Sequence, residues 1–254
     1  MPKGIWIISL EVIPLNLEPF IFDCEVFAYD WLFVFKNKVT GEYTEIWNDN
    51  EAVEQFMTQE PLLAGFNNKH YDQFILKAVL SGFTPEEIKA VNDFIIVGGH
   101  EGWEYAPLRD CGIFFDQYDL MDDCQMGLSL KAIEAHLGMD IRETTVSFNI
   151  NRPLTEDEKR EVEFYCRHDV DATDRLDNLR QGYLSSKLTL GREKGLYPAK
   201  ALYMTNAKLT AAYLDAQQKP HYDEREYQYP PKLLRQYIPQ EVFDFFERLK
   251  DKSI

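Results

Sequence analysis

The sequence predicts an α/β domain with a mixed central sheet flanked by helices, followed by a mostly helical C-terminal extension. Two observations lead to this prediction. Three β-rich segments come first, and after them segments of strand character alternate with segments of helical periodicity. The 254 residues, 45% of them hydrophobic, suffice for one large domain or for a domain with an appendage.

The β-rich segments lie within the first fifty residues. Segments 20–26 and 31–35 are apolar and rich in aromatic and β-branched side chains, and a turn signal at 38–41 separates them from a third candidate strand at 43–47. These segments predict a three-stranded meander.

Helix signals begin after this meander. Thr84, followed by Pro85 and Glu87, has the pattern of a helix N-cap, and Thr155 with Glu158 forms a capping box that opens a long helix running past Leu176. The other elements that we expect up to residue 180 are helices at 51–58, 72–80 and 129–137 and strands at 62–66 and 113–120.

After Gln181 the character of the chain changes. Gly191, Gly195 and Pro198 mark a loop-rich stretch, and we place a domain boundary near 182, between residues 1–181 and 182–254. Within the second part we expect helices at 199–216 and 239–249 on either side of a loop at 221–231.

The net charge of −16 excludes binding of nucleic acid over the whole surface by phosphate neutralisation. Residues 183–210 differ from the rest in charge, because this segment contains five basic residues and a single acid, Glu193. This basic segment is either an ordinary solvated face or a local contact for phosphate or a partner.

The expected compartment is a reducing cytoplasm. The four cysteines are far apart and include no CxxC pair, so neither a disulfide framework nor a zinc module is indicated. The longest apolar runs are too short for a bilayer span, and no secretory signal is recognised, so we expect no membrane association.

Three acidic motifs stand in order along the chain. Asp23 and Glu25 lie two residues apart on a predicted strand, so both carboxylates point to one face, which is costly unless a cation lies between them. Asp72 follows the predicted strand-to-helix turn that contains Asn67, and Asp169 lies one helical turn after Tyr165.

Each motif alone also has a structural interpretation. Asp72 is a potential helix cap with Asn67 as a turn former, and Asp169 could pair with Arg167 or Arg175 while Tyr165 packs in the core. Asp119, Asp122 and Asp123 are interpreted as a strand end and loop with a helix cap, and the spacing of His70 and His168 does not indicate a zinc site.

Taken together, the motifs resemble the signature of 3′–5′ exonucleases with a ribonuclease H-like fold, in the tyrosine-containing DEDDy subclass. The motif sequences are most similar to the proofreading exonuclease domain of phage-type family B DNA polymerases, and this resemblance implies the cytoplasm of a bacterium or of a phage-infected host. The resemblance covers about residues 18–180, and it is carried by segments 21–25, 65–67 with 71–72, 128–133 and 165–169.

The resemblance implies roles for the motif residues. Asp23 would be shared by two divalent ions, Mg²⁺ or Mn²⁺, with Glu25 and Asp169 completing the shell of the first ion and Asp72 holding the second. Tyr165 would orient the attacking water. Such hard, oxygen-seeking ions also neutralise clustered carboxylates, which makes the assignment physically consistent.

For the substrate, the resemblance implies that Asn67 helps hold the strand near the scissile phosphate. Phe27, Phe66 and Tyr71 are candidates for stacking on the bases of a single-stranded 3′ end. Each could equally be a core residue, and for Phe66 we favour the core.

The expected function is therefore a metal-dependent 3′–5′ exonuclease that removes nucleotides from the 3′ end of DNA, with a DNA polymerase domain or subunit as candidate partner. The alternatives are an RNA-trimming exonuclease of the same superfamily and a module that binds nucleic acid or a polymerase without cutting. No segment resembles the palm motifs of a polymerase, so we expect either a stand-alone exonuclease or the N-terminal part of a polymerase.

Overall fold

The computed structural model describes residues 18–122, 124, 127–217, 239–242 and 244–245. Contacts divide the chain into a first unit, Met1–Leu214, which contains the central sheet, and a second unit, Asp215–Ile254. In the second unit, the predicted loop at 221–231 lies outside the described residues, and so does part of the predicted helix at 239–249.

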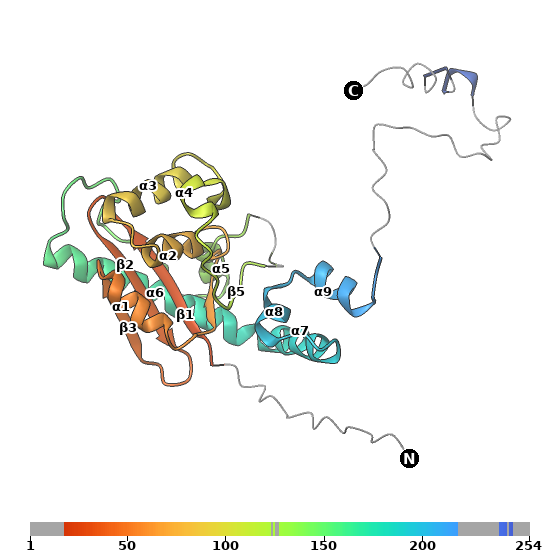
Figure 1. Cartoon of the computed structure of the whole chain (residues 1–254), viewed down its shortest axis with the longest axis horizontal. Coiled ribbons are helices and arrows are strands. Elements are labelled where there is room, and N and C mark those ends of the chain that lie inside the picture. Colours follow the sequence, from red (N-terminus) through yellow and green to blue (C-terminus); the bar gives the residue numbers. More distant parts are fainter. Residues whose placement is uncertain (1–17, 123, 125–126, 218–238, 243, 246–254) are drawn as a thin grey trace, which may run out of the picture. The chain divides into compact units, whose positions relative to one another are not determined.

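A mixed five-stranded sheet in the order β3-β2-β1-β4-β5 forms the centre of the first unit (Figure 1). β1 pairs antiparallel with β2 and parallel with β4; β2 pairs antiparallel with β3, and β4 pairs parallel with β5. The strands are β1 (Phe20–Val26), β2 (Trp31–Asn37), β3 (Tyr43–Trp47), β4 (Leu63–Gly65) and β5 (Gln117–Asp119).

The predicted meander is confirmed, whereas the strand predicted at 113–120 is too long. Among the described residues, β5 pairs with β4 alone, and the three residues of β4 offer partners for Gln117 to Asp119 and no further. The residues before this pairing do not all turn inward, since Phe114 is 89% exposed. The apolar character of 113–115 therefore does not reflect a strand.

The helices cover both faces of the sheet. Those of the first unit are α1 (Asn50–Met57), α2 (Asp72–Leu80), α3 (Pro85–Ile96), the 3₁₀ turn η1 (Gly102–Glu104), α4 (Ala106–Arg109), α5 (Leu130–His136), α6 (Glu156–Leu179), α7 (Gln181–Glu193), α8 (Pro198–Tyr203) and α9 (Asn206–Tyr213). The capping boxes predicted at Thr84 and Thr155 are both present.

Two hydrophobic clusters lie on opposite faces of the sheet. Because side chains alternate along a strand, β1 supplies Phe22 and Cys24 to a cluster that also contains residues of α1, α2 and α3. It supplies Ile21 to a second cluster, which contains residues of α5, α6, α7 and α8. Asp23 and Glu25 have the parity of Ile21 and so point toward the side of α6.

Helix α7 lies in the stretch that the sequence predicts to be loop-rich. Gly191 belongs to this helix, and a Cβ added to it would lie 2.4 Å from the Cβ of Ala201. This glycine therefore permits close packing of α7 against α8. The helix predicted at 199–216 is in fact two helices, because Met204 is extended and Thr205 caps α9.

The first lysine of the basic segment, Lys187, is directed inward. Lys187 is only 3% exposed, and its ammonium donates hydrogen bonds to the carbonyls of Leu202 at 2.9 Å and Met204 at 2.6 Å. Its positive charge thus offsets the partial negative charge of the free carbonyls at the C-terminal end of α8. The predicted functional division at 182 stays a prediction, although α7, α8 and α9 belong by contacts to the same compact unit as the sheet.

In the part of the chain that the structure describes, none of the helices has both the length and the apolar character needed to cross a membrane.

Candidate metal centre

The three acidic motifs converge beside the end of β4. Asp23 and Glu25 come from the middle of β1, Asp72 is the first residue of α2, and Asp169 lies in α6, which packs on β1. Charge repulsion acts between Asp23 and each of the other three carboxylates, so all four lie within one cluster.

The sheet register explains this position. β1 and β4 run parallel with Ile21 opposite Ala64, so β1 continues past the point where β4 ends at Gly65. Asp23 thereby faces the turn that follows β4. Together with Asn67 and Asp169 it lines an open pocket of about 400 Å³.

Burial makes this cluster electrostatically costly. Glu25 is 9% exposed, Asp72 4% and Asp169 8%. Burial, and then repulsion by neighbouring carboxylates, raises the pKa of Asp23 and of Glu25 well above the ordinary values. Burial also raises the pKa of Asp72 to about 6. Such a group of anions is stabilised by any cation that enters it.

Two buried thiols border the carboxylates, and the sequence analysis gave them no role. The Cys24 thiol donates a hydrogen bond to Asp72 Oδ1 at 3.1 Å, and Cys166 Sγ lies 3.8 Å from Asp23 Oδ2. Burial, and then the nearby carboxylates, raises the pKa of both thiols, so they stay protonated as weak donors. The signal for Cys166 was its position three residues before Asp169, on the same helix face.

Lys131 of α5 is a further residue of the site for which the sequence predicted no role. Its ammonium forms an ion pair with Asp169 and lies 4.8 Å from the centre of the Tyr165 ring. Lys131 belongs to one of the segments that carry the family resemblance, which is the signal that could have found it. It supplies one positive charge to the edge of a cluster of four carboxylates.

Tyr165 is half-buried one turn before Asp169. Burial, and then the charges of Asp169, Glu25 and Asp23, raises the pKa of its hydroxyl above the ordinary value. The hydroxyl therefore remains protonated at neutral pH and can donate a hydrogen bond to an oxygen atom in the pocket.

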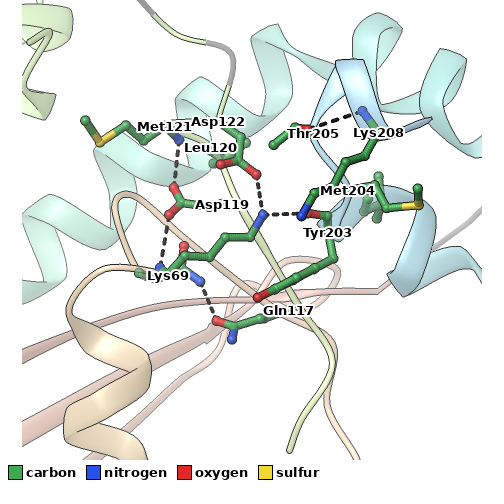
Figure 2. A network of polar contacts seen from close by, with 12 residues as sticks. Lys69, Gln117, Asp119, Leu120, Met121, Asp122, Tyr203, Met204, Thr205 and Lys208 are labelled. Atoms are coloured by element: carbon green, nitrogen blue, oxygen red, sulfur yellow. Dashed lines mark hydrogen bonds and ion pairs between the residues drawn. The ribbon is translucent and has the colours of Figure 1, made fainter. Parts of the chain in front are cut away.

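Asp119 holds the turn that contains Asn67. Its carboxylate accepts backbone N–H groups from Asn67 at 2.8 Å, Lys69 at 3.0 Å and Met121 at 2.8 Å. Figure 2 shows the bonds from Lys69 and Met121. Asn67 adopts a φ of 64°, in the left-handed region that asparagine tolerates better than most residues. The predicted strand-end position of Asp119 is confirmed, since it is the last residue of β5.

Lys69 connects this turn to α8. Its ammonium forms an ion pair with Asp122, donates a hydrogen bond to the carbonyl of Tyr203 at 2.7 Å, and lies 4.2 Å from the centre of the Tyr203 ring (Figure 2). Asp122 therefore binds Lys69 and does not cap α5. The N-cap of α5 is Ser129. Asp123 lies outside the described residues.

The three aromatic candidates occupy different places. Phe27 is fully buried, with its ring stacked on Phe148 at 5.1 Å, which corresponds to its alternative interpretation as a core residue. Tyr71 packs against the core and donates its hydroxyl to Asn92 at 2.7 Å. Phe66 packs against the other core cluster and also lines the pocket with Asn67.

Two groups of side chains in the described residues could hold a metal ion. The ligand atoms of Asp23, Glu25 and Cys166 lie within 4.8 Å of one another, and so do those of Glu134, His168 and Asp169. Carboxylate oxygens favour hard divalent cations, and an imidazole nitrogen extends the choice to transition metals.

No protein family, curated protein or solved structure matches the chain.

Proposed function

We propose that the chain is a two-metal 3′–5′ exonuclease that removes nucleotides from the 3′ end of DNA, as a proofreading domain or subunit of a phage-type DNA polymerase. The observation that carries the proposal is the convergence of four carboxylates, three buried and Asp23 partly buried, from three separate motifs beside Tyr165. The strand order, with an antiparallel meander and two further parallel strands, is compatible with a ribonuclease H-like fold.

The donor set fits two Mg²⁺ or Mn²⁺ ions. Four carboxylates gathered in one cluster are stabilised by hard divalent cations, and Lys131 alone supplies too little positive charge. Asp23 would be shared, with Glu25 and Asp169 on one ion and Asp72 on the other. When bound, such a pair of ions supplies an activated water and stabilisation of the leaving 3′-oxygen.

The chain's own residues would position the substrate around this centre. Tyr165 would orient the attacking water through its protonated hydroxyl. Asn67 would hold the terminal nucleotide in the pocket that it shares with Asp23. Phe66 lines the same pocket and offers a surface for base stacking. Lys131 would hold Asp169 in place through their ion pair.

The test is a gel assay on 5′-labelled single-stranded DNA with Mg²⁺ or Mn²⁺, using wild type and Asp23→Asn. We expect a ladder that shortens from the 3′ end, is blocked by a 3′-modified strand, and falls by orders of magnitude in Asp23→Asn. Glu86→Gln, at an exposed carboxylate in the first turn of α3, is the matched control and should retain wild-type activity.

The same assay separates the alternatives. Faster shortening of an RNA strand than of DNA would assign the chain to the RNA-trimming exonucleases. Absence of cleavage by the wild type with either metal, together with retention of a labelled strand in a binding assay, would favour a module that binds without cutting.

A further inference from the structure

Glu134 of α5 is a fully buried acid. The residue is 0% exposed, and neither of its carboxylate oxygens has a hydrogen-bond partner among the described residues. Its carboxylate oxygens lie 3.6 Å from the ammonium of Lys131 and 3.6 Å from Nδ1 of His168. Burying an ionised group in this way is costly unless a cation compensates it directly.

His168 of α6 faces the same point. Its Nδ1 is buried, has no hydrogen-bond partner among the described residues, and lies 3.7 Å from Asp169 Oδ1. Its distances to Glu134 and Asp169 are too long for hydrogen bonds. They are close to the separation of about 3.4 Å expected between two ligands that bind one metal at about 2.1 Å in tetrahedral geometry.

We propose that Glu134, His168 and Asp169 form a separate binding site for a borderline divalent transition metal ion, Zn²⁺ in preference to Mg²⁺. One imidazole nitrogen and two carboxylate oxygens match the ligands of Zn²⁺, whereas Mg²⁺ favours oxygen alone. The three ligand atoms lie within 4.8 Å of one another, which leaves a fourth position for water.

Lys131 occupies the edge of this site as a competing cation. Its ammonium pairs with Asp169, and its side chain is 26% exposed, so it can turn toward solvent when a metal ion replaces it. The ion balances the charges of Glu134 and Asp169 completely, whereas Lys131 balances one. Because Asp169 is also a ligand of the proposed catalytic centre, Zn²⁺ bound here should inhibit the exonuclease; this consequence, unlike the binding itself, rests on the proposed function.

The binding is tested without an activity assay. Zn²⁺ is titrated calorimetrically into the chelator-treated full chain, and Co²⁺ is used as a spectroscopic probe whose visible absorption reports a low-coordinate site with a nitrogen ligand. We expect His168→Asn and Glu134→Gln each to weaken Zn²⁺ binding at least tenfold and to abolish the Co²⁺ band. His136→Asn, at an exposed histidine in the last turn of α5, is the matched control and should bind as wild type.

Asp23→Asn separates this site from the proposed catalytic centre, since Asp23 is not one of its ligands. We expect this variant to keep the Zn²⁺ affinity and the Co²⁺ band. Equal Zn²⁺ binding by His168→Asn and wild type would overturn the inference, as would a Co²⁺ band that depends on Asp23 instead of His168. Circular dichroism and urea unfolding of each variant confirm that a lost site does not reflect a lost fold.

The two proposals can fail independently. Zn²⁺ binding that requires Glu134 and His168 in a chain without nuclease activity would support this site and refute the exonuclease. Nuclease activity in a chain whose Zn²⁺ binding ignores both residues would do the reverse.

Discussion

Replacing Asp72 by Asn is expected to stabilise the metal-free protein. Asp72 is buried at 4% exposure, and burial raises its pKa from 3.8 to about 6. A rise of about two pH units corresponds to roughly 3 kcal/mol of unfavourable free energy when the carboxylate is ionised in the folded state. Asn removes this charge and keeps an oxygen that can accept the hydrogen bond from Cys24.

The sign of the pH dependence follows from linkage. Because the folded-state pKa of Asp72 lies above the unfolded-state value, the folded protein binds more protons between pH 3.8 and about 6. Stability of the wild type therefore falls as pH rises through this window. Burial and repulsion at Asp23 and Glu25 act in the same direction, since their pKa values are also raised.

The assay is urea and thermal unfolding in EDTA at pH 4 and pH 7.5. At pH 7.5 we expect Asp72→Asn to be more stable by roughly 3 kcal/mol, or by roughly 6–12 °C in Tm, and at pH 4 the difference should be small. Added Mn²⁺ should stabilise the wild type more than the variant, because the variant has lost a ligand.

The matched control for this prediction is Glu86→Gln, which also removes an acid from the first turn of a helix but at an exposed position. It should change stability little at either pH. An Asp72→Asn variant no more stable than wild type at pH 7.5, or one whose advantage persists at pH 4, would refute the electrostatic reasoning.

Three further outcomes are expected. Tyr165→Phe should slow single-turnover DNA hydrolysis by roughly 10- to 100-fold, less than loss of a metal-binding carboxylate, with an unchanged unfolding curve. Lys187→Met should lower the free energy of unfolding by roughly 2–4 kcal/mol, because two carbonyls at the C-terminal end of α8 lose a buried ammonium. In urea unfolding this should appear as a lower midpoint with an unchanged slope. Asp119→Ala should cost roughly 1–3 kcal/mol and slow hydrolysis more than it weakens calorimetric Mn²⁺ binding, because it releases the turn at Asn67 without removing a proposed ligand.

Much of the fold could be predicted because its signals are local. The meander, α2 and the capping boxes at Thr84 and Thr155 depend on neighbouring residues in the chain, and the structure has them where the sequence placed them. α7 could not be predicted in the same way. Gly191 acts as a helix breaker in isolation, but in the fold it provides the close contact with Ala201.

In the candidate site too, local motifs could be predicted and contacts between distant segments could not. The four carboxylates could be found because each lies in a short motif with a fixed spacing, and the structure brings them together. The contacts of Cys24 with Asp72 and of Lys131 with Asp169 join elements that are distant in sequence. The pairing of Glu134 with His168 was hidden for the same reason, since α5 and α6 each contribute one residue.

The rate at which the two buried thiols are alkylated reports how often the carboxylate cluster opens. Cys24 and Cys166 are buried and held protonated, so alkylating reagents reach them only when the surrounding elements separate. Cys111 and Cys124 are partly exposed and should be modified earlier. The slow phase of alkylation then times the opening of the carboxylate cluster, and any ion that binds inside should lengthen it in proportion to its affinity.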